Sequence, residues 1–301
     1  MIPLEDFLWP VQEALFQKLR RNYREHAMYC KGKYLLVQGE APILLLAHLD
    51  TVHKEPVQVI RKKKGGNILT SPQGIGGDDR CGVYALANIH EQAARKPWLL
   101  FTCDEEIGGV GAEVFADAYQ KKQFPKALDE VKMLVELDRK GSQDAVYYGC
   151  ANEDFEKYIT SKGFRTEFGS FSDISVVAPA MGIAAVNLSI GYYHAHTTSE
   201  YINRRHTDAV IEKVSGIVAE SARQDVPQYE YIGCHMGFYG WDFYPMREGY
   251  RWHYAKLPKD LPKKYEEVYD ILLDYFAMEE LELYRKEYGD EILLDLYVSV
   301  F

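Results

Sequence analysis

Five short stretches of acidic and histidine residues stand where buried strands of this chain are expected to end. They are Ala47-His48-Leu49-Asp50, Gly77-Asp78-Asp79-Arg80, Asp104-Glu105-Glu106, Glu136-Leu137-Asp138 and His194-Ala195-His196. Strand ends of an open α/β sheet are where such folds gather their functional residues. Carboxylates and imidazoles that meet there form a charged site, which metal ions normally balance. The combined set predicts two divalent cations about 3.5–4 Å apart and a hydrolase that uses them.

Each stretch, taken alone, also has a plainer explanation. His48 and Asp50 are typical of a polar pair that closes a strand. Asp78 and Asp79 stand at an expected helix start, where acidic residues commonly serve as caps. Asp138 is equally typical of a strand that leaves the core for solvent. Only the five stretches together favour a metal site.

The acidic triplet Asp104-Glu105-Glu106 directly follows an apolar run and suggests two separate roles for its glutamates. A solvated acidic turn is the simpler interpretation of three successive acids. In the functional interpretation, one glutamate binds metal and its neighbour stays free. Such a free carboxylate near the metals is well placed to take a proton from water.

The elements that position these residues alternate between strand and helix. Apolar runs predict strands at 34–38, 43–47, 98–103, 131–137, 145–148 and 184–190, and helical spacing predicts helices at 81–91, 110–119, 154–161 and 207–222. The first 20 residues are expected to form one amphipathic helix, and residues 57–70 a hairpin with a basic tip at 62–66. The alternation predicts an α/β protein, a three-layer α-β-α sandwich around a mostly parallel mixed sheet.

The composition changes near Asp225, which predicts two parts. Residues 1–225 would form the catalytic domain, and residues 226–301 a Tyr-rich extension that ends in helices. These helices are expected at about 264–278 and 279–298, where acidic and apolar residues recur at helical spacing. The fold class therefore includes a small helical C-terminal appendage.

Composition and charge exclude several classes of protein. With 301 residues and a net charge of −10, the chain is not expected to bind nucleic acid or an anionic membrane surface. No apolar run approaches the roughly 20 residues that span a bilayer. The five cysteines are scattered and show no CxxC spacing, so neither a disulfide framework nor a thiolate zinc site is indicated. A cytoplasmic protein is expected.

The ordered motifs resemble those of the co-catalytic two-zinc exopeptidase superfamily, which includes leucyl-type and glutamyl-type zinc aminopeptidases and carboxypeptidase-like amidohydrolases. The matching text is His48-Leu49-Asp50, Gly77-Asp78-Asp79-Arg80-Cys81-Gly82, Asp104-Glu105-Glu106-Ile107-Gly108-Gly109, Glu136-Leu137-Asp138 and His196-Thr197-Thr198-Ser199-Glu200, within residues 35–222. Only 29 residues separate His48 from Asp78, and 57 separate Asp138 from His196. These gaps are too short for the extra domains of larger relatives, so the chain resembles a minimal catalytic domain.

The resemblance implies a role for each matching residue. His48 and Asp138 would hold one metal, Glu106 and His196 would hold the other, and Asp78 would bridge them. The catalytic residues would be Glu105, as general base, and Asp50, which would orient His48. The peptide bond between Asp78 and Asp79 is expected to be cis. His194 remains an alternative to His196, which is favoured by its spacing to Glu200.

The function implied is metal-dependent hydrolysis of amide bonds, most plausibly by an aminopeptidase that acts on peptides or small amides. Two divalent ions per chain are expected, with zinc favoured and cobalt or manganese also suited to such ligands. One alternative is an N-acyl amino acid deacylase or carboxypeptidase-type amidohydrolase, in which Arg204 or Arg205 would bind the substrate carboxylate. The other is a non-enzymatic scaffold that keeps the fold. Homo-oligomerisation is left open.

Overall fold

The computed structural model describes residues 2–53, 55–150, 152–169, 171–223 and 226–232, and further on residues 258, 260–262, 265, 268–269, 272, 278–294 and 296. Contacts along the chain divide it into two units, Met1–His235 and Met236–Phe301, which are described separately. Residues just beyond the expected boundary pack on the first unit, since the backbone of Tyr229 bonds to that of Lys132 and Ala184. The division into a catalytic domain, 1–225, and an extension, 226–301, stays a prediction.

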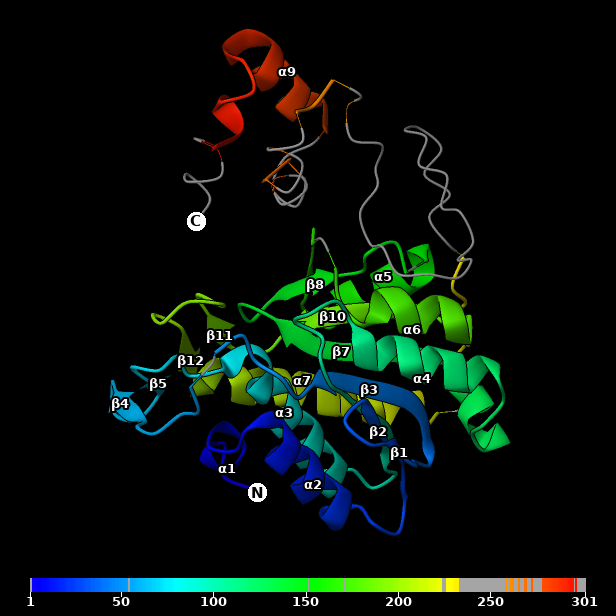
Figure 1. Cartoon of the computed structure of the whole chain (residues 1–301). Coiled ribbons are helices and arrows are strands. Elements are labelled where there is room, and N and C mark those ends of the chain that lie inside the picture. Colours follow the sequence, from blue (N-terminus) through cyan, green and yellow to red (C-terminus); the bar gives the residue numbers. More distant parts are fainter. Residues whose placement is uncertain are drawn as a thin grey trace. The chain divides into compact units, whose positions relative to one another are not determined.

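The first unit is built on an eight-stranded mixed sheet in the order β1-β2-β6-β3-β7-β10-β8-β9 (Figure 1). Its central strands β6, β3, β7 and β10 run parallel. Strands β1 and β2 pair antiparallel with their neighbours, and β8 is antiparallel to β10 but parallel to β9. The strands are β1 Ala27–Cys30, β2 Tyr34–Val37, β3 Ala41–His48, β6 Pro97–Thr102, β7 Met133–Arg139, β8 Asp144–Val146, β9 Arg165–Glu167 and β10 Ala185–Ser189.

Helices cover both faces of this sheet (Figure 1). They are α1 Glu5–Leu8, α2 Gln12–Asn22, α3 Gly77–Gln92, α4 Val110–Gln120, α5 Glu153–Ser161, α6 Ile174–Met181 and α7 Arg204–Ser221, with a 3-10 turn η1 Lys126–Glu130. Apolar residues of α1, α2, α3, α5 and α7 pack on one face, and those of α4 and α6 on the other. The predicted three-layer sandwich is therefore confirmed.

Strand β3 shows how a continuous apolar run serves two layers. Leu45 and Ala47 belong to the apolar cluster on the α3 side, and Leu44 and Leu46 to the cluster on the α4 side. Successive side chains of a strand point to opposite faces, so a strand covered on both faces must be apolar throughout. The run ends at His48, where the strand reaches the edge of the core.

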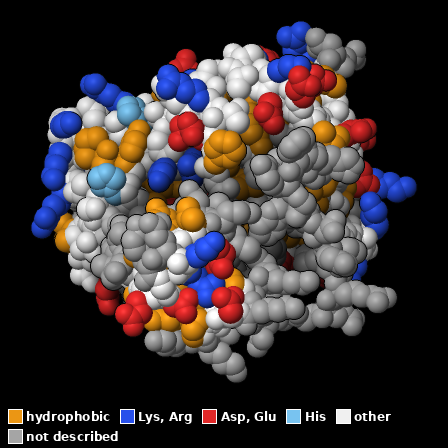
Figure 2. Space-filling view, turned by 90° about the horizontal axis from the view of Figure 1, so that it is seen from above, with side chains coloured by type: hydrophobic (Ala, Val, Ile, Leu, Met, Phe, Trp, Pro, Cys, Tyr) orange, Lys and Arg blue, Asp and Glu red, His pale blue; other side chains and the backbone are white. Residues whose placement is uncertain are grey.

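A second sheet of four antiparallel strands, in the order β11-β12-β5-β4, adjoins the loops that follow β10. It comprises β4 Arg61–Lys63, β5 Ile68–Thr70, β11 Tyr192–Tyr193 and β12 Tyr201–Asn203. The predicted hairpin is present, but its first strand is formed by the basic residues themselves, and the turn lies at 64–67. The three β4 side chains are exposed, and basic side chains gather at the side of the molecule where Figure 1 places β4 (Figure 2).

The first 20 residues do not form the single helix expected. They form α1 and α2, separated at Trp9-Pro10, with Val11 in an extended conformation. Proline has no backbone N–H to donate and its ring clashes with the preceding turn, so the helix cannot continue through position 10. Phe7 and Leu15 of the two helices are nevertheless buried in the same apolar cluster.

The second unit has a small apolar cluster of its own, formed by Leu261, Tyr265, Tyr269, Leu272, Leu281 and Leu293. Helix α9, Met278–Tyr288, begins one residue before the helix predicted at 279–298 and ends ten residues before its predicted end. The helix predicted at 264–278 lies largely outside the described residues. Among the described residues of both units, no helix is long and apolar enough to cross a membrane.

Candidate active site

The sheet brings the predicted residues together at the carboxyl ends of its parallel strands. His48 is the last residue of β3, Asp138 is near the end of β7, and Glu105 follows β6. Strands β6 and β7 are the two neighbours of β3. Asp78 enters from the start of α3, and His196 from the loop between β11 and β12.

Asp78 stands between two imidazoles. Its Oδ1 lies 3.1 Å from Nε2 of His48, and its Oδ2 lies 3.1 Å from Nε2 of His196. Nε2 of His48 is also 3.4 Å from Oδ1 of Asp138, and Nε2 of His196 is 3.1 Å from Oε2 of Glu106. His48, Asp78 and Asp138 thus form one group of potential metal ligands, and Asp78, Glu106 and His196 form another, with ligand atoms within 4.8 Å of one another in each.

The electrostatics of the cluster fit a bound cation. Burial, reinforced by Asp138, Asp173 and Glu106, raises the pKa of Glu105 to about 9. Burial and Asp78 likewise raise the pKa of Asp138 to about 7, against the opposing effect of His48. Oε1 of Glu106 is buried and has no hydrogen-bond partner. Crowded carboxylates with raised pKa values and an unsatisfied oxygen are the donor set that a divalent ion would stabilise.

Asp50 ties the first motif to the acidic loop. Its carboxylate accepts hydrogen bonds from the backbone N–H groups of Glu105 and Glu106, at 3.1 and 3.0 Å. Oδ1 of Asp50 also lies 3.3 Å from Nδ1 of His48. Nδ1 is the ring nitrogen that points away from Asp78, which is the position that the orienting role implied by the resemblance requires.

Asp79 stabilises the end of β3 through the backbone of His48. It accepts hydrogen bonds from the backbone N–H of His48, at 3.3 Å, and from that of Gly82, at 2.9 Å. A Cβ at position 82 would lie 2.2 Å from the carbonyl oxygen of Leu137, so only glycine allows α3 to begin this close to β7. The Asp78–Asp79 peptide bond is cis, as the resemblance led us to expect.

The sequence interpretation missed the support of Asp138. The side chain of Asn187, in β10, accepts from the backbone N–H of Asp138 at 2.9 Å and donates to its carbonyl oxygen at 2.9 Å. The hydroxyl of Tyr192 donates to Oδ1 of Asp138 at 3.2 Å. An asparagine inside the apolar run Ala184–Ile190 was the available signal, because a fully buried strand normally excludes an unpaired amide.

Glu200 organises the loop that carries Asp78. Its buried carboxylate accepts hydrogen bonds from the backbone N–H groups of Gly76 and Asp78, at 2.9 and 3.0 Å, and contacts Nε2 of His53 at 2.9 Å. The spacing from His196 to Glu200 therefore has a structural basis, since one loop supplies both residues.

Two further carboxylates, unnoticed in the sequence, are buried beside the cluster. Glu136 is bonded to Ser172, and Asp173 to Thr102. Burial and Asp138 raise the pKa of Glu136 well above its usual range, and burial raises that of Asp173 to about 6. Glu136 belongs to the stretch Glu136-Leu137-Asp138, but its spacing predicts no role for it. Asp173 directly precedes α6 and is part of none of the five stretches.

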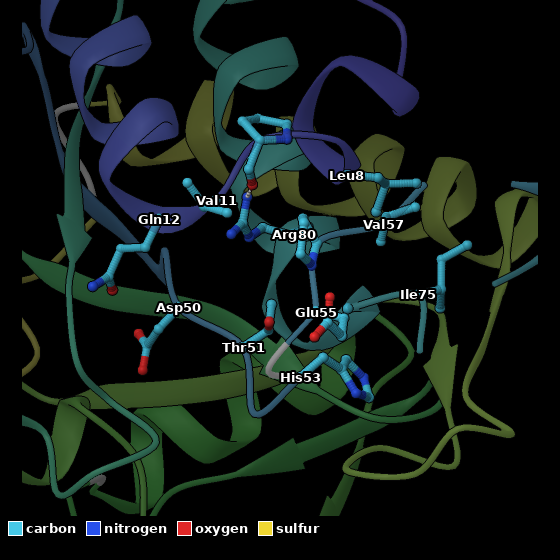
Figure 3. Close-up of a pocket in the computed structure, with 13 residues that line it drawn as sticks. Leu8, Val11, Gln12, Asp50, Thr51, His53, Glu55, Val57, Ile75 and Arg80 are labelled. Atoms are coloured by element: carbon cyan, nitrogen blue, oxygen red, sulfur yellow. Dashed lines mark hydrogen bonds between the residues drawn. The ribbon is translucent and has the colours of Figure 1, made fainter. Parts of the chain in front are cut away.

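Behind Asp50 lies a pocket of about 240 Å³ between the N-terminal helices and the loop 51–57 (Figure 3). Arg80 forms part of its wall and donates to the carbonyl oxygens of Phe7 and Pro10, at 3.0 and 2.7 Å. Burial lowers the pKa of Arg80 to about 10, although Asp50 and Asp79 oppose this effect. Arg80 thus anchors the end of α1 and the residue Pro10 behind the cluster.

The remaining predicted residues lie elsewhere. His194 packs edge-on against Tyr201 and belongs to none of the ligand groups found among the described residues, whereas His196 belongs to one. Arg204 lies 3.7 Å from Glu5, and Arg205 is exposed on α7.

The fold and the gathered carboxylates and imidazoles define a metal-dependent hydrolase of the α/β class. The model of peptidase family M28 matches residues 32–256, so the chain belongs to that family. It is therefore a metallopeptidase, and the resemblance to two-zinc exopeptidases is confirmed. No curated protein sequence matches the chain.

Solved structures share the fold at low sequence identity. The aminopeptidase PepT of Bacillus cereus is 15% identical, with a TM-score of 0.52 over 73% of this chain and 97% of that one. A tripeptidase of Staphylococcus aureus is 12% identical, with a TM-score of 0.54 and the same coverage. A TET aminopeptidase from a marine-sediment Thaumarchaeota archaeon is 11% identical, with a TM-score of 0.55 over 74% of this chain and 97% of that one.

Proposed function

We propose that the chain is an aminopeptidase that removes residues from the free amino end of peptides, using two divalent cations, with zinc favoured. The observation that carries this proposal is the placement of Asp78, whose two oxygens face two different imidazoles. Each imidazole has a second carboxylate beside it, so two ion sites share one bridging group. His48, Asp78 and Asp138 would hold one ion, and Asp78, Glu106 and His196 the other.

When bound, such cations supply Lewis-acid activation of a water molecule and of the scissile carbonyl. The chain's own base is Glu105, whose side chain is mostly buried and lies 4.0 Å from Nε2 of His48. Glu105 accepts a proton from the attacking water and later delivers it to the leaving amine. Asp50 holds both His48 and the backbone of Glu105, which keeps base and ligand in a fixed relation.

Several relatives support the choice of an exopeptidase that acts at the amino end. PepT and the TET protein are described as aminopeptidases, and the staphylococcal protein as a tripeptidase. The excess of carboxylates at the site also suits the cationic amino terminus of a peptide. The TET1 peptidase of Pyrococcus horikoshii, 15% identical, assembles into a tetrahedron or a large octahedral shell. A homo-oligomer accordingly belongs to the proposal, and light scattering tests it.

The decisive experiment combines metal analysis with two substrate panels. Free-amine aminoacyl anilides and their N-acetylated counterparts are offered to the purified protein before and after dialysis against a chelator. We expect about two zinc ions per chain, hydrolysis of the free amines only, and loss of activity on chelation that zinc restores. Hydrolysis of the N-acetylated panel alone would identify a deacylase, and activity that survives complete metal removal would overturn the proposal.

A further inference from the structure

The residue after Asp138 is a cation with no anionic partner in the part of the chain that the structure describes. Arg139 ends β7, and its Nη2 donates to the carbonyl oxygen of Phe168 at 3.1 Å. Its Nε is shielded from solvent and has no hydrogen-bond partner. No carboxylate of the described residues forms an ion pair with Arg139, although the neighbouring cluster is rich in carboxylates. A guanidinium that is half-buried and lacks an anion favours the approach of one.

A series of contacts connects Arg139 with the candidate active site. Asn187, whose side chain makes two hydrogen bonds with the backbone of Asp138, also donates to the hydroxyl of Tyr148 at 3.4 Å. The ring of Tyr148 in turn lies against Gly169, where an added Cβ would be only 2.7 Å from it. Arg139 bonds to Phe168, the residue before that glycine. Asp138, Tyr148, Phe168 and Arg139 therefore belong to one connected patch.

The same loop reaches the acidic loop that carries the proposed base. A Cβ at Gly109 would lie 2.8 Å from the ring of Phe171, and Ser172 is bonded to the buried carboxylate of Glu136. The side chain of Phe168 is 91% exposed, so its ring is open to contact by a bound molecule. Residues 168–169 thus contact Arg139 and Tyr148, and residues 171–172 contact the edge of the cluster.

We propose that Arg139 is a specificity-determining residue that binds a carboxylate of the substrate, with Phe168 packing against the same substrate residue. This inference rests on the proposed function and narrows it to one class of peptide. A guanidinium binds a carboxylate with two parallel hydrogen bonds, which a neutral amide of the same shape cannot match. An anionic group near Asp78, Asp138 and Glu105 would otherwise be repelled, so a substrate of this kind needs such a cation.

The carboxylate has two sources: the side chain of an N-terminal Asp or Glu, or the terminal carboxylate of a short peptide. A glutamyl and a glutaminyl anilide test the first source, because one carries a side-chain carboxylate where the other carries a neutral amide. A Leu-Leu dipeptide and its C-terminal amide separate the second. The wild type is compared with Arg139→Gln, Arg139→Lys and the control Arg205→Gln, which removes an exposed charge on α7.

For one of the two pairs, we expect the wild type to favour the carboxylate substrate over its amide by about 10- to 100-fold in kcat/KM. Arg139→Gln should abolish that ratio, Arg139→Lys should retain part of it, and Arg205→Gln should leave it unchanged. The thermal unfolding midpoint should stay near the wild-type value in all variants, which excludes unfolding, and Arg205→Gln should also keep wild-type activity on the uncharged leucyl anilide. Hydrolysis of free amines without preference in either pair would overturn the role of Arg139 and leave the aminopeptidase proposal intact. Inactivity on every free-amine substrate would overturn both.

Discussion

The two ligand groups that share Asp78 are built differently. In the first, the side chains of His48 and Asp138 are almost fully buried, at 1% and 9% exposure, and both belong to central strands. In the second, the side chain of His196 is 57% exposed and stands in a loop, with a positive φ of 64°. The sheet therefore fixes one group, whereas a surface loop completes the other.

The supporting contacts differ in the same way. Asp50 and Asp79 hold His48, and Asn187 and Tyr192 hold Asp138. Glu106 is held through its backbone by Asp50, while the imidazole of His196 meets Asp78 and Glu106 and otherwise faces solvent. The first group is therefore held by protein contacts on several sides, whereas the second has a solvent-exposed side at His196.

Glu105 lies between the two groups, and its removal should have the largest effect. In Glu105→Gln, kcat/KM on free-amine anilides is expected to fall by about 10²- to 10⁴-fold, because no carboxylate remains to take the proton of water. Zinc content, measured by atomic emission, should stay at the wild-type value. The control is Glu130→Gln, an exposed glutamate of η1, which should be fully active. Equal activity of the two variants would contradict the role of Glu105.

The difference in burial can be tested through stability. In metal-free protein, His48→Ala should lower the free energy of unfolding by about 3–5 kcal/mol, because it leaves buried carboxylates without their cationic partner. His196→Ala should lower it by less than about 1 kcal/mol, because water replaces an exposed ring. Urea titrations of both variants measure these values. Similar losses in the two would show that the groups do not differ as described.

In the first group, Asn187 holds the backbone of Asp138. Asn187→Ala removes both side-chain bonds to the backbone of Asp138 and should weaken zinc binding by about 10- to 100-fold. Competition with a chromogenic chelator measures the affinity. Asn67→Ala, at the turn of the β4–β5 hairpin, is the matched control and should bind zinc normally. Unchanged affinity in Asn187→Ala would mean that the strand alone positions Asp138.

The crowded carboxylates also predict a dependence of metal-free stability on pH. Burial raises the pKa of Glu105 to about 9, of Asp138 to about 7 and of Asp173 to about 6. Each group therefore keeps a proton in the folded chain at pH values where the unfolded chain has lost it, so stability falls as pH rises from about 4 to 9. The two histidines act in the same direction, because their carboxylate partners raise the pKa of His196 to about 11 and, against burial, that of His48.

Thermal unfolding of the chelated protein at pH 5, 7 and 9 tests this dependence. The midpoint should decrease along the series, and the decrease should be smaller when zinc is bound, because the ions neutralise the same carboxylates. A midpoint that rises from pH 5 to pH 9 in the metal-free protein would contradict the sign derived from the cluster.

Much of the fold was predictable because burial leaves a direct trace in the sequence. Runs such as Ile43–Leu46 and Met133–Val135 are apolar throughout, as strands covered on both faces must be, and both lie in central strands. The elements that were missed are short or edge strands, such as β1 and β9, and the proline-containing helix α6. The side chains of β9 are exposed, so the strand shows no apolar run. Strand β1, with four residues, and helix α6, with eight, are too short to show a clear period.

The sequence by itself determined which chemical groups are present and in which order, because strand ends mark the places where polar residues can leave the core. Only the tertiary structure decided which of them meet. It joined His196 rather than His194 to Asp78, and it placed Asn187 on both sides of the Asp138 backbone. Among the described residues, it also left Arg139 without an anionic partner. Such contacts depend on strand order and loop direction, which join residues far apart in the chain and which no local spacing encodes.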